Sequence, residues 1–296
     1  MRKNLVKNKR TIAALLVLFV AMLIVAMDSR MIVRQYEIDA VEVNTSVRIA
    51  LVTDLHSCFY GEGQQKLISA IDAQKPDLVL LGGDIFDDQM DDTNTEIFIA
   101  GIAQKYPCYY VTGNHEYWSE KDAFAAKMLV LERYGVVVLS GDCKTIEFGG
   151  ETINICGVDD PDSYMMRYDL VADAQGYINA QLGKLDTFRQ QLNEVRELSD
   201  NENFTILLSH RPERFADYVS CGFDLVLCGH AHGGQWRIPG ILNGLYAPDQ
   251  GLFPRYAGGE YEQDGTIMLV SRGLARESTR LPRIFNRPEL VIIEVK

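Results

Sequence analysis

Residues Val47–His56 read VRIALVTDLH, an apolar, strand-like run that ends in two side chains able to bind a metal ion. Four further runs end in a similar way, and the five together contain all five histidines of the chain. They are Asp77–Asp84 (DLVLLGGD), Tyr109–His115 (YYVTGNH), Phe204–His210 (FTILLSH) and Phe223–His232 (FDLVLCGHAH). Ligands of open α/β sheets collect just beyond the carboxyl ends of the strands. The pattern therefore predicts one polar site built from five strand ends.

Helical segments separate the first of these runs. Apolar residues recur at helical spacing in 64–74, 95–105 and 119–134, which indicates amphipathic helices between strands. Alternation of strands and helices favours βαβ units and a sheet with parallel strands. Short β-like pieces follow residue 135, and a long polar helix is expected over 178–198. We find no internal repeat, so a single α/β domain over residues 47–296 is the simplest organisation.

The N-terminal segment has a separate character. Residues 1–10 contain five basic side chains, and residues 11–27 contain no charged side chain. As a helix, this apolar run would span roughly 26 Å, the short end of what a bilayer requires. We expect a basic cytoplasmic head (1–10), a transmembrane anchor (11–27) and a connector (28–46). Cleavage as a signal peptide stays open as an alternative.

The distribution of basic residues predicts the orientation of this anchor. Five basic residues precede the apolar run, and only Arg30 and Arg34 follow it closely. The excess of positive charge is expected on the cytoplasmic side. The prediction is a single-pass protein of the cell membrane whose catalytic domain is extracytoplasmic.

Charge restricts the classes of partner. The formal net charge is −12, so we expect no surface that follows the phosphates of a nucleic acid. An acidic protein that acts on an anionic substrate needs local positive charge, which bound metal ions can supply.

The six cysteines bear on the compartment, because exported chains usually pair or avoid cysteine. Cys156 and Cys228 lie in apolar strands, where a thiol behaves as a small hydrophobic group. The other four lie near the ends of segments, and no C-x-x-C motif is present. We favour buried free thiols, and a disulfide stays open.

The strand ends supply seven candidate metal ligands. Two residues separated by one can converge on a single centre, as in Asp54-x-His56 and His230-x-His232. A carboxylate such as Asp84 can bridge two ions, because it has two oxygens. Each element alone is more often structural, but all occur at equivalent positions. Nitrogen and oxygen ligands without thiolate suit Mn, Fe, Zn or Ni. The candidates are Asp54, His56, Asp84, Asn114, His210, His230 and His232.

The motifs resemble those of the calcineurin-like metallophosphoesterase superfamily: Asp54-x-His56, GDIFD (83–87), GNHE (113–116), His210 and GHAH (229–232). The tail, with GHAHGGQWRIPG and VSRGLARES, resembles a bacterial subfamily of membrane-associated or exported phosphodiesterase-like proteins. The resemblance implies a four-layer sandwich of two mixed β-sheets flanked by helices. It also implies two divalent ions that share Asp84, one held with Asp54, His56 and His232, the other with Asn114, His210 and His230.

The resemblance also implies a mechanism. A hydroxide bridging the two ions would attack phosphorus, in the manner of two-metal sites. His115 is spare in the ligand count and would protonate the leaving oxygen or stabilise the developing charge. Asp87 would orient His115 or a ligand, with a solvated loop carboxylate as the alternative interpretation.

One position departs from the pattern of the superfamily's protein phosphatases. Those enzymes continue the second motif with Arg-Gly, whereas Asp88-Gln89 follows here. This departure argues against a protein phosphatase and favours a phosphodiester or pyrophosphate. Three arginines in the tail could bind phosphate, or could be structural or surface residues: Arg237, Arg255 and Arg272.

The hypothesis from the sequence is a membrane-anchored, dinuclear phosphodiesterase-like enzyme. A lipid-linked or envelope-derived substrate follows only from the expected location. Two alternatives stay open: a phosphomonoesterase with the same site, and a metal-binding sensor or scaffold without turnover. The sequence identifies neither the substrate-binding residues nor the oligomeric state.

Overall fold

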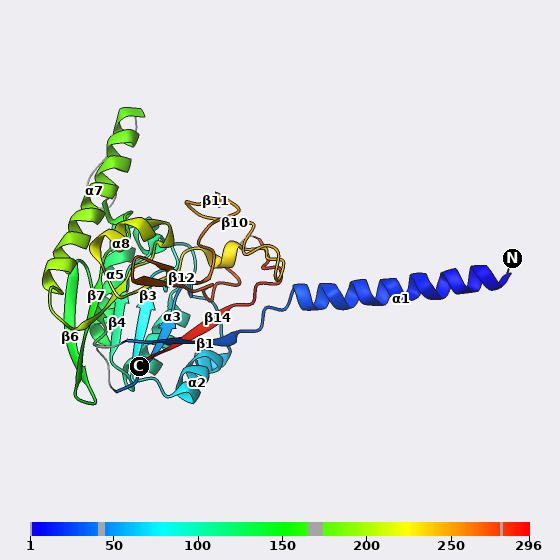
Figure 1. Ribbon diagram of the computed structural model, residues 1–296, viewed down its shortest axis with the longest axis horizontal. Coiled ribbons are helices and arrows are strands. Elements are labelled where there is room, and N and C mark those ends of the chain that lie inside the picture. The colour runs from blue at the N-terminus through cyan, green and yellow to red at the C-terminus, as the bar shows by residue number, and fades with distance from the viewer. Residues whose placement is uncertain (1, 41–44, 165–173, 279–280) are drawn as a thin grey trace.

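Two six-stranded mixed sheets form the body of the protein. The computed structural model describes residues 2–40, 45–164, 174–278 and 281–296 (Figure 1). The first sheet contains, in spatial order, β1 (Ile32–Ile38), β14 (Glu289–Val295), β2 (Val47–Val52), β3 (Leu78–Gly82), β4 (Cys108–Val111) and β5 (Val137–Val138). The second contains β12 (Gly259–Gln263), β13 (Thr266–Val270), β9 (Leu225–Cys228), β8 (Phe204–Leu208), β7 (Glu151–Gly157) and β6 (Asp142–Phe148).

Strand direction explains why the polar residues meet at one rim. Strands β2, β3, β4 and β5 are parallel to one another, as are β7, β8, β9 and β13. Antiparallel pairs join β14 to β2, β12 to β13 and β6 to β7, so both sheets are mixed as expected. A separate two-stranded ribbon pairs β10 (Tyr246–Ala247) with β11 (Gly251–Leu252).

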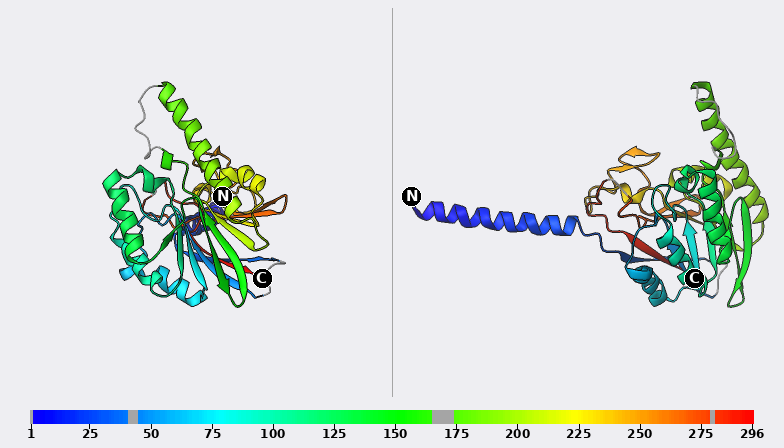
Figure 2. Two further views of the ribbon diagram at one scale, coloured as in Figure 1. Left: turned by 90° about the vertical axis from the view of Figure 1, so that its left-hand side faces the viewer. Right: turned by 180° about the vertical axis from the view of Figure 1, so that it is seen from behind.

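Helices cover the outer faces of the sheets (Figure 2). Helix α1 (Arg2–Ala26) lies apart from the sheets. The other helices of the described chain are α2 (Gln65–Gln74), α3 (Thr93–Ala103), α4 (Asn114–Trp118), α5 (Lys121–Arg133), α7 (Ala174–Leu198) and α8 (Phe215–Cys221). Short 3-10 turns occur at η1 (Glu62–Gln64), η2 (Pro212–Arg214) and η3 (His232–Gly234).

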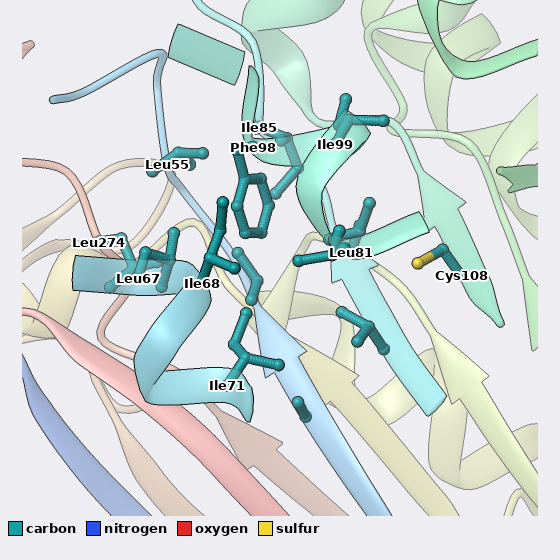
Figure 3. Packing of buried hydrophobic residues seen from close by; sticks show 14 of the residues in the cluster. Leu55, Leu67, Ile68, Ile71, Leu81, Ile85, Phe98, Ile99, Cys108 and Leu274 are labelled. Atoms are coloured by element: carbon teal, nitrogen blue, oxygen red, sulfur yellow. The ribbon is translucent and has the colours of Figure 1, made fainter. Parts of the chain in front are cut away.

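Three apolar layers hold this arrangement together. Between the sheets, β2 and β3 contribute Ile49 and Leu80, which share a buried cluster with Ile206 of β8. On the outer face of the first sheet, α2 and α3 bury side chains such as Leu67 and Phe98 (Figure 3). On the outer face of the second sheet, α7 and α8 bury Phe188 and Phe215. The order is therefore helix, sheet, sheet, helix, and the expected α/β architecture is confirmed.

The N-terminal helix α1 extends away from the domain (Figure 1). Its apolar side chains are exposed, with Ile12 at 64% and Ile24 at 70% of full exposure. Across the described residues, no helix was found with both the length and the apolar character needed to cross a membrane. The side chains of the expected basic head, residues 1–10, lie outside the description.

The expected connector contains a strand. Strand β1 pairs in parallel with β14 over its whole length, from Ile32 opposite Glu289 to Ile38 opposite Val295. Residues 32–38 are therefore part of the first sheet, although residues 41–44 of the connector lie outside the description. The division of the chain into head, anchor, connector and domain otherwise stays a prediction.

The preference for free thiols was wrong at one pair of cysteines. Cys143 of β6 and Cys156 of β7 lie directly opposite each other in the antiparallel register and form a disulfide. The remaining four cysteines are free: Cys58, Cys108, Cys221 and Cys228.

Candidate metal centre

The candidate ligands follow the carboxyl ends of five strands, three from the first sheet and two from the second. Direct hydrogen bonds connect the two sheets at this rim. The Nδ1–H of His210, which follows β8, donates to the Gly82 carbonyl at the end of β3 over 2.9 Å. The backbone N–H of His230, which follows β9, donates to Asp54 Oδ1 over 2.8 Å. The structure thus brings together residues that are up to 178 positions apart, from Asp54 to His232.

All seven candidate ligands are buried, with exposures from 0% to 7%. Each has one buried nitrogen or oxygen atom that makes no hydrogen bond: Asp54 Oδ2, His56 Nε2, Asp84 Oδ2, Asn114 Oδ1, His210 Nε2, His230 Nδ1 and His232 Nδ1. A buried polar atom without a partner costs about 1–3 kcal/mol. Cations bound among these atoms would satisfy them, so the residues fit divalent metal ions.

Asp84 lies between two groups of ligands. Its Oδ2 atom is 3.5 Å from His56 Nε2 and 3.1 Å from His210 Nε2. One group places ligand atoms of Asp54, His56, Asp84 and His232 within 4.8 Å of one another, and the other does so for Asp84, His210 and His230. Asp84 belongs to both groups, which is the arrangement that a bridging carboxylate requires.

Hydrogen bonds select the tautomers of two candidate ligand histidines. Asp87 Oδ2 accepts from His56 Nδ1 over 2.9 Å, and the bond to the Gly82 carbonyl places the proton of neutral His210 on Nδ1. In neutral His56 and His210 the proton is therefore on the outer nitrogen, so the unpaired nitrogen presents its lone pair to the centre. His230 Nε2 lies 2.9 Å from Asp249 Oδ2 and 3.0 Å from Arg211 Nη1, an acceptor and a donor, so these contacts do not select its tautomer.

The electrostatics of the cluster suit a bound cation. Burial and the neighbouring Arg211 lower the pKa of His230 to about 3. Burial and the neighbouring His56 also hold the pKa of His232 well below its usual range, so both rings are neutral. Burial opposes ionisation of Asp84, but the nearby imidazoles, His210 above all, hold its pKa well below its usual range. Neutral imidazole and ionised carboxylate are the forms that bind metals.

Metal uptake should release protons near neutral pH. Burial disfavours a charged His210, but the surrounding carboxylates, Asp84 above all, together raise the His210 pKa to about 10. Below that pH a metal must displace the proton, so affinity should rise with pH up to about 10 and fall as pH decreases. Addition of Mn²⁺ to metal-free protein at pH 8 in weak buffer should acidify an indicator dye. If His210→Asn releases as many protons as the wild type, this assignment is wrong.

His115 occupies the exposed side of the centre. Its Nδ1 atom is 2.6 Å from Asp88 Oδ1, and its backbone N–H donates to Asp84 Oδ1 over 2.9 Å. Its side chain is 24% exposed, and its ring centroid is 4.3 Å from that of His56. With Nδ1 on Asp88, the Nε2 atom of this partly exposed ring is not engaged by that contact.

Asp87 and Asp88 divide the orienting roles between them. Asp87 is buried and bonds the candidate ligand His56, which excludes the interpretation as a solvated loop carboxylate. It is 3.6 Å from His115 Nδ1, beyond hydrogen-bonding distance. Asp88, the residue at which the sequence departs from the protein phosphatases, makes the close contact with His115 instead.

The backbone is strained at the ligands. Five of the seven have φ angles in the left-handed region: Asp54 (50°), His56 (47°), Asp84 (51°), His230 (65°) and His232 (46°). Such conformations are uncommon for residues other than glycine and concentrate at functional sites. Two adjoining glycines permit the close approach, because a Cβ at Gly113 would be 2.2 Å from Asp84 Oδ1 and one at Gly229 would be 2.6 Å from Asp54 Oδ2.

A buried carboxylate that was not predicted from sequence connects two of the loops that contain candidate ligands. Glu116 is fully buried, and its two oxygens accept hydrogen bonds from four backbone N–H groups. The donors belong to Gly113, Asp84, Ile85 and Phe86. Glu116 therefore fixes the position of the loop after β3 relative to the loop after β4. Its position directly after His115 in GNHE was the available signal.

A second missed group connects the long loop after β9 to the centre. Asp249 bonds His230 Nε2 and also forms an ion pair with Arg211. Arg211 is itself buried and pairs with Asp160, with an Nη2–Oδ1 distance of 2.9 Å. Because Asp249 is 19 residues from His230 in a loop without regular apolar spacing, no sequence signal identified it.

Asp249→Asn should weaken metal retention. The amide can still bond His230 Nε2 but carries no charge, so it supports the ligand less strongly. Loss of a residue that orients a ligand typically lowers metal affinity about 10–100-fold. Metal content after dialysis against a graded chelator measures the effect. Asp217→Asn, at an aspartate that pairs with Arg189 on the surface, is the matched control. Equal retention by both variants would show that Asp249 has no such role.

The three arginines considered from sequence do not bond the ligands in the described part of the chain. Arg272 bonds Glu289, with a Nε–Oε2 distance of 2.7 Å. The guanidinium of Arg255 stacks 5.1 Å from the ring centroid of Tyr256. Arg237 donates to the Gly233 carbonyl and to Asn243. None is therefore assigned to the metal centre.

The chain is similar to several known proteins. Residues 47–234 match the family model described as calcineurin-like phosphoesterase. An uncharacterized metallophosphoesterase of Aquifex aeolicus is 26% identical over 89% of this chain and 91% of its own length. One of Helicobacter pylori is 26% identical over 78% of this chain, which spans only 55% of that relative. The NAD nucleotidase of Haemophilus influenzae aligns over 78% of this chain and 51% of its own, with 18% identity and a TM-score of 0.47.

Proposed function

Because the chain belongs to the calcineurin-like phosphoesterase family, we propose that it hydrolyses a phosphodiester or a pyrophosphate with two divalent ions. The family and the relatives named as metallophosphoesterases make it a metal-dependent phosphoester hydrolase. One observation carries the proposal of two ions: seven buried atoms without partners, divided into groups that share Asp84. Asn114, whose buried Oδ1 atom has no partner, is assigned to the second group with His210 and His230, as in the family motif GNHE.

In the proposed reaction the chain's own residues have separable tasks. Bound divalent ions would polarise the phosphoryl oxygens and supply the nucleophile from water at neutral pH. Asp84 and the other ligands hold the centre, while Asp87, Asp249 and Glu116 fix the ligands in place. His115, oriented by Asp88, would donate a proton from Nε2 to the leaving oxygen.

The charge around His115 supports a phosphodiester over a phosphomonoester. At the position where protein phosphatases of this type have a phosphate-binding arginine, the chain has Asp88, whose side chain is 14% exposed. A carboxylate there repels the dianion of a phosphomonoester more than the single charge of a phosphodiester. The preference therefore follows from the electrostatics at the leaving-group side of the centre.

Steady-state kinetics on matched chromogenic substrates tests the proposal. With Mn²⁺ added, kcat/KM should be higher for bis-p-nitrophenyl phosphate than for p-nitrophenyl phosphate. A higher value for the monoester would make the protein a phosphomonoesterase. Absence of turnover on a broad ester panel, with metal bound, would favour the sensor or scaffold.

We also propose that α1 anchors the chain in a membrane, with the domain on the extracytoplasmic side. The uncharged run in residues 11–27, its exposed apolar side chains and the basic residues before it support an anchor. The Cys143–Cys156 disulfide supports an oxidising compartment, because disulfides persist mainly outside the cytoplasm. An envelope-derived or lipid-linked substrate is consistent with that location.

The chain should remain in the membrane fraction after a high-salt wash, because screening of charge does not release an apolar span. In intact cells stripped of their wall, added protease should digest the domain. Cleavage seen only after lysis would show that the orientation is wrong, and release by salt would contradict the anchor itself.

A further inference from the structure

A pocket of ≈ 510 Å³ lies against the loop after β9 and is lined by three arginines. Arg34 comes from the edge strand β1, Arg237 from the loop after β9, and Arg272 from the segment after β13. The turn 238–242, Asn243 and Phe285 complete the wall. No acidic side chain lines the pocket among the residues that the structure describes.

The positive charge of the pocket exceeds the negative charge available to it. Glu289 is fully buried, and its Oε2 atom pairs with both Arg272 (2.6 Å) and Arg34 (3.1 Å). In the described chain, Arg237 forms no ion pair with a carboxylate, and its partners are the neutral oxygens of Gly233 and Asn243. Burial and the neighbouring Arg272 lower the pKa of Arg237 to about 10, so it is still charged at neutral pH. Three guanidinium groups therefore share one carboxylate, in a chain whose net charge is −12.

The pocket lies next to the end of α1. The Phe285 N–H donates to the carbonyl of Ala26, the last residue of that helix, over 2.7 Å. The preceding residue, Ile284, accepts from the Arg237 N–H over 2.9 Å. The pocket is therefore joined through two consecutive residues to the point where the N-terminal helix meets the domain.

An exposed apolar turn forms the outer edge of the pocket. Ile238 and Leu242 pair with each other, and Ile241 at the tip is 84% exposed. Gly240 has a φ of 74°, a left-handed conformation that allows the chain to reverse between them. Large exposed apolar groups beside a basic site are typical of surfaces that contact a membrane interface.

We propose that this pocket binds the phosphate of an anionic phospholipid headgroup, while the turn 238–242 enters the adjoining lipid. The guanidinium groups supply paired hydrogen bonds to the phosphodiester oxygens. Ile238 and Ile241 gain apolar contact that a free phosphate in solution would not provide. The site is separate from the hydrolytic centre and would set how the domain is held against the membrane surface.

Lipid binding by the full-length chain in neutral detergent tests this site. Titration calorimetry should show saturable binding of dihexanoyl-phosphatidylglycerol at least about tenfold tighter than dihexanoyl-phosphatidylcholine. Inorganic phosphate should bind more weakly than the anionic lipid. Arg237→Gln and Arg34→Gln should each weaken binding about fivefold, the contribution typical of one basic residue at an anionic membrane surface.

Arg133→Gln is the matched control, because Arg133 is an exposed arginine paired with Glu96 away from the pocket. It should bind the lipid as the wild type does. Unfolding midpoints and turnover of bis-p-nitrophenyl phosphate should be unchanged in all three variants, which shows that the fold and the hydrolytic centre are intact. Any one of three results would overturn the proposal. They are equal affinity for the two lipids, phosphate binding as tight as lipid binding, and the same affinity for the anionic lipid in Arg237→Gln, Arg34→Gln and the wild type.

Discussion

His115→Ala should lose most of the turnover while both metal groups stay occupied. His115 is not among the seven residues with an unpaired atom at the centre, yet its ring lies directly beside His56. A positioned imidazole that protonates a leaving group contributes about 10²–10⁴-fold to the rate. We expect a loss of that size in kcat for an alkyl diester, with unchanged metal content and unfolding midpoint.

The leaving group distinguishes the possible roles of His115. Nitrophenolate departs without a proton, so the variant should be slowed much less on bis-p-nitrophenyl phosphate than on an alkyl diester. Equal slowing on both substrates would indicate general stabilisation of charge. Loss of metal as in a ligand variant would instead make His115 a ligand or a structural support. Asp88→Asn should show a smaller version of the same pattern, because Asp88 only orients the ring.

Asp84→Ala should deplete metal from both groups and reduce turnover to background. Asp84 is the only residue that belongs to both ligand groups, and its Oδ2 atom lies between His56 and His210. The Asp84 carboxylate also raises the pKa of His210, so its removal should lower that pKa. Metal analysis of the purified variant by mass spectrometry measures the loss.

His232→Ala is the control for this result. His232 belongs to one group only, so its loss should weaken mainly the ion held with Asp54 and His56. Near-normal content of two metals per chain in Asp84→Ala would contradict the bridging role. A circular dichroism spectrum like that of the wild type separates metal loss from unfolding.

The strand ends could be identified from sequence because each apolar run is followed within a few residues by a candidate ligand. Asp54, Asp84 and His210 each follow a run of buried residues directly, so the sheet that the runs form also places the ligands. The same local pattern predicted most strands and the helical layers. Because the strands that precede these residues are parallel within each sheet, their carboxyl ends lie at one rim, where the residues meet.

What the sequence did not reveal depends on contacts between distant residues. Strand β1 has mostly exposed residues and pairs with β14, some 257 positions away at Ile32 and Glu289, so no apolar run marked it. The disulfide depends on the register that sets Cys143 opposite Cys156. Asp249 approaches His230 only because the long loop folds back over the rim.

The central claim is that seven buried atoms hold two ions that share one carboxylate. Anomalous X-ray diffraction from crystals of the protein loaded with Mn²⁺ tests it most directly. We expect two peaks about 3.5–4 Å apart, the spacing of two-metal sites, one beside Asp54 and His232 and the other beside His210 and His230, with Asp84 between them. A single peak, or peaks away from these residues, would contradict it.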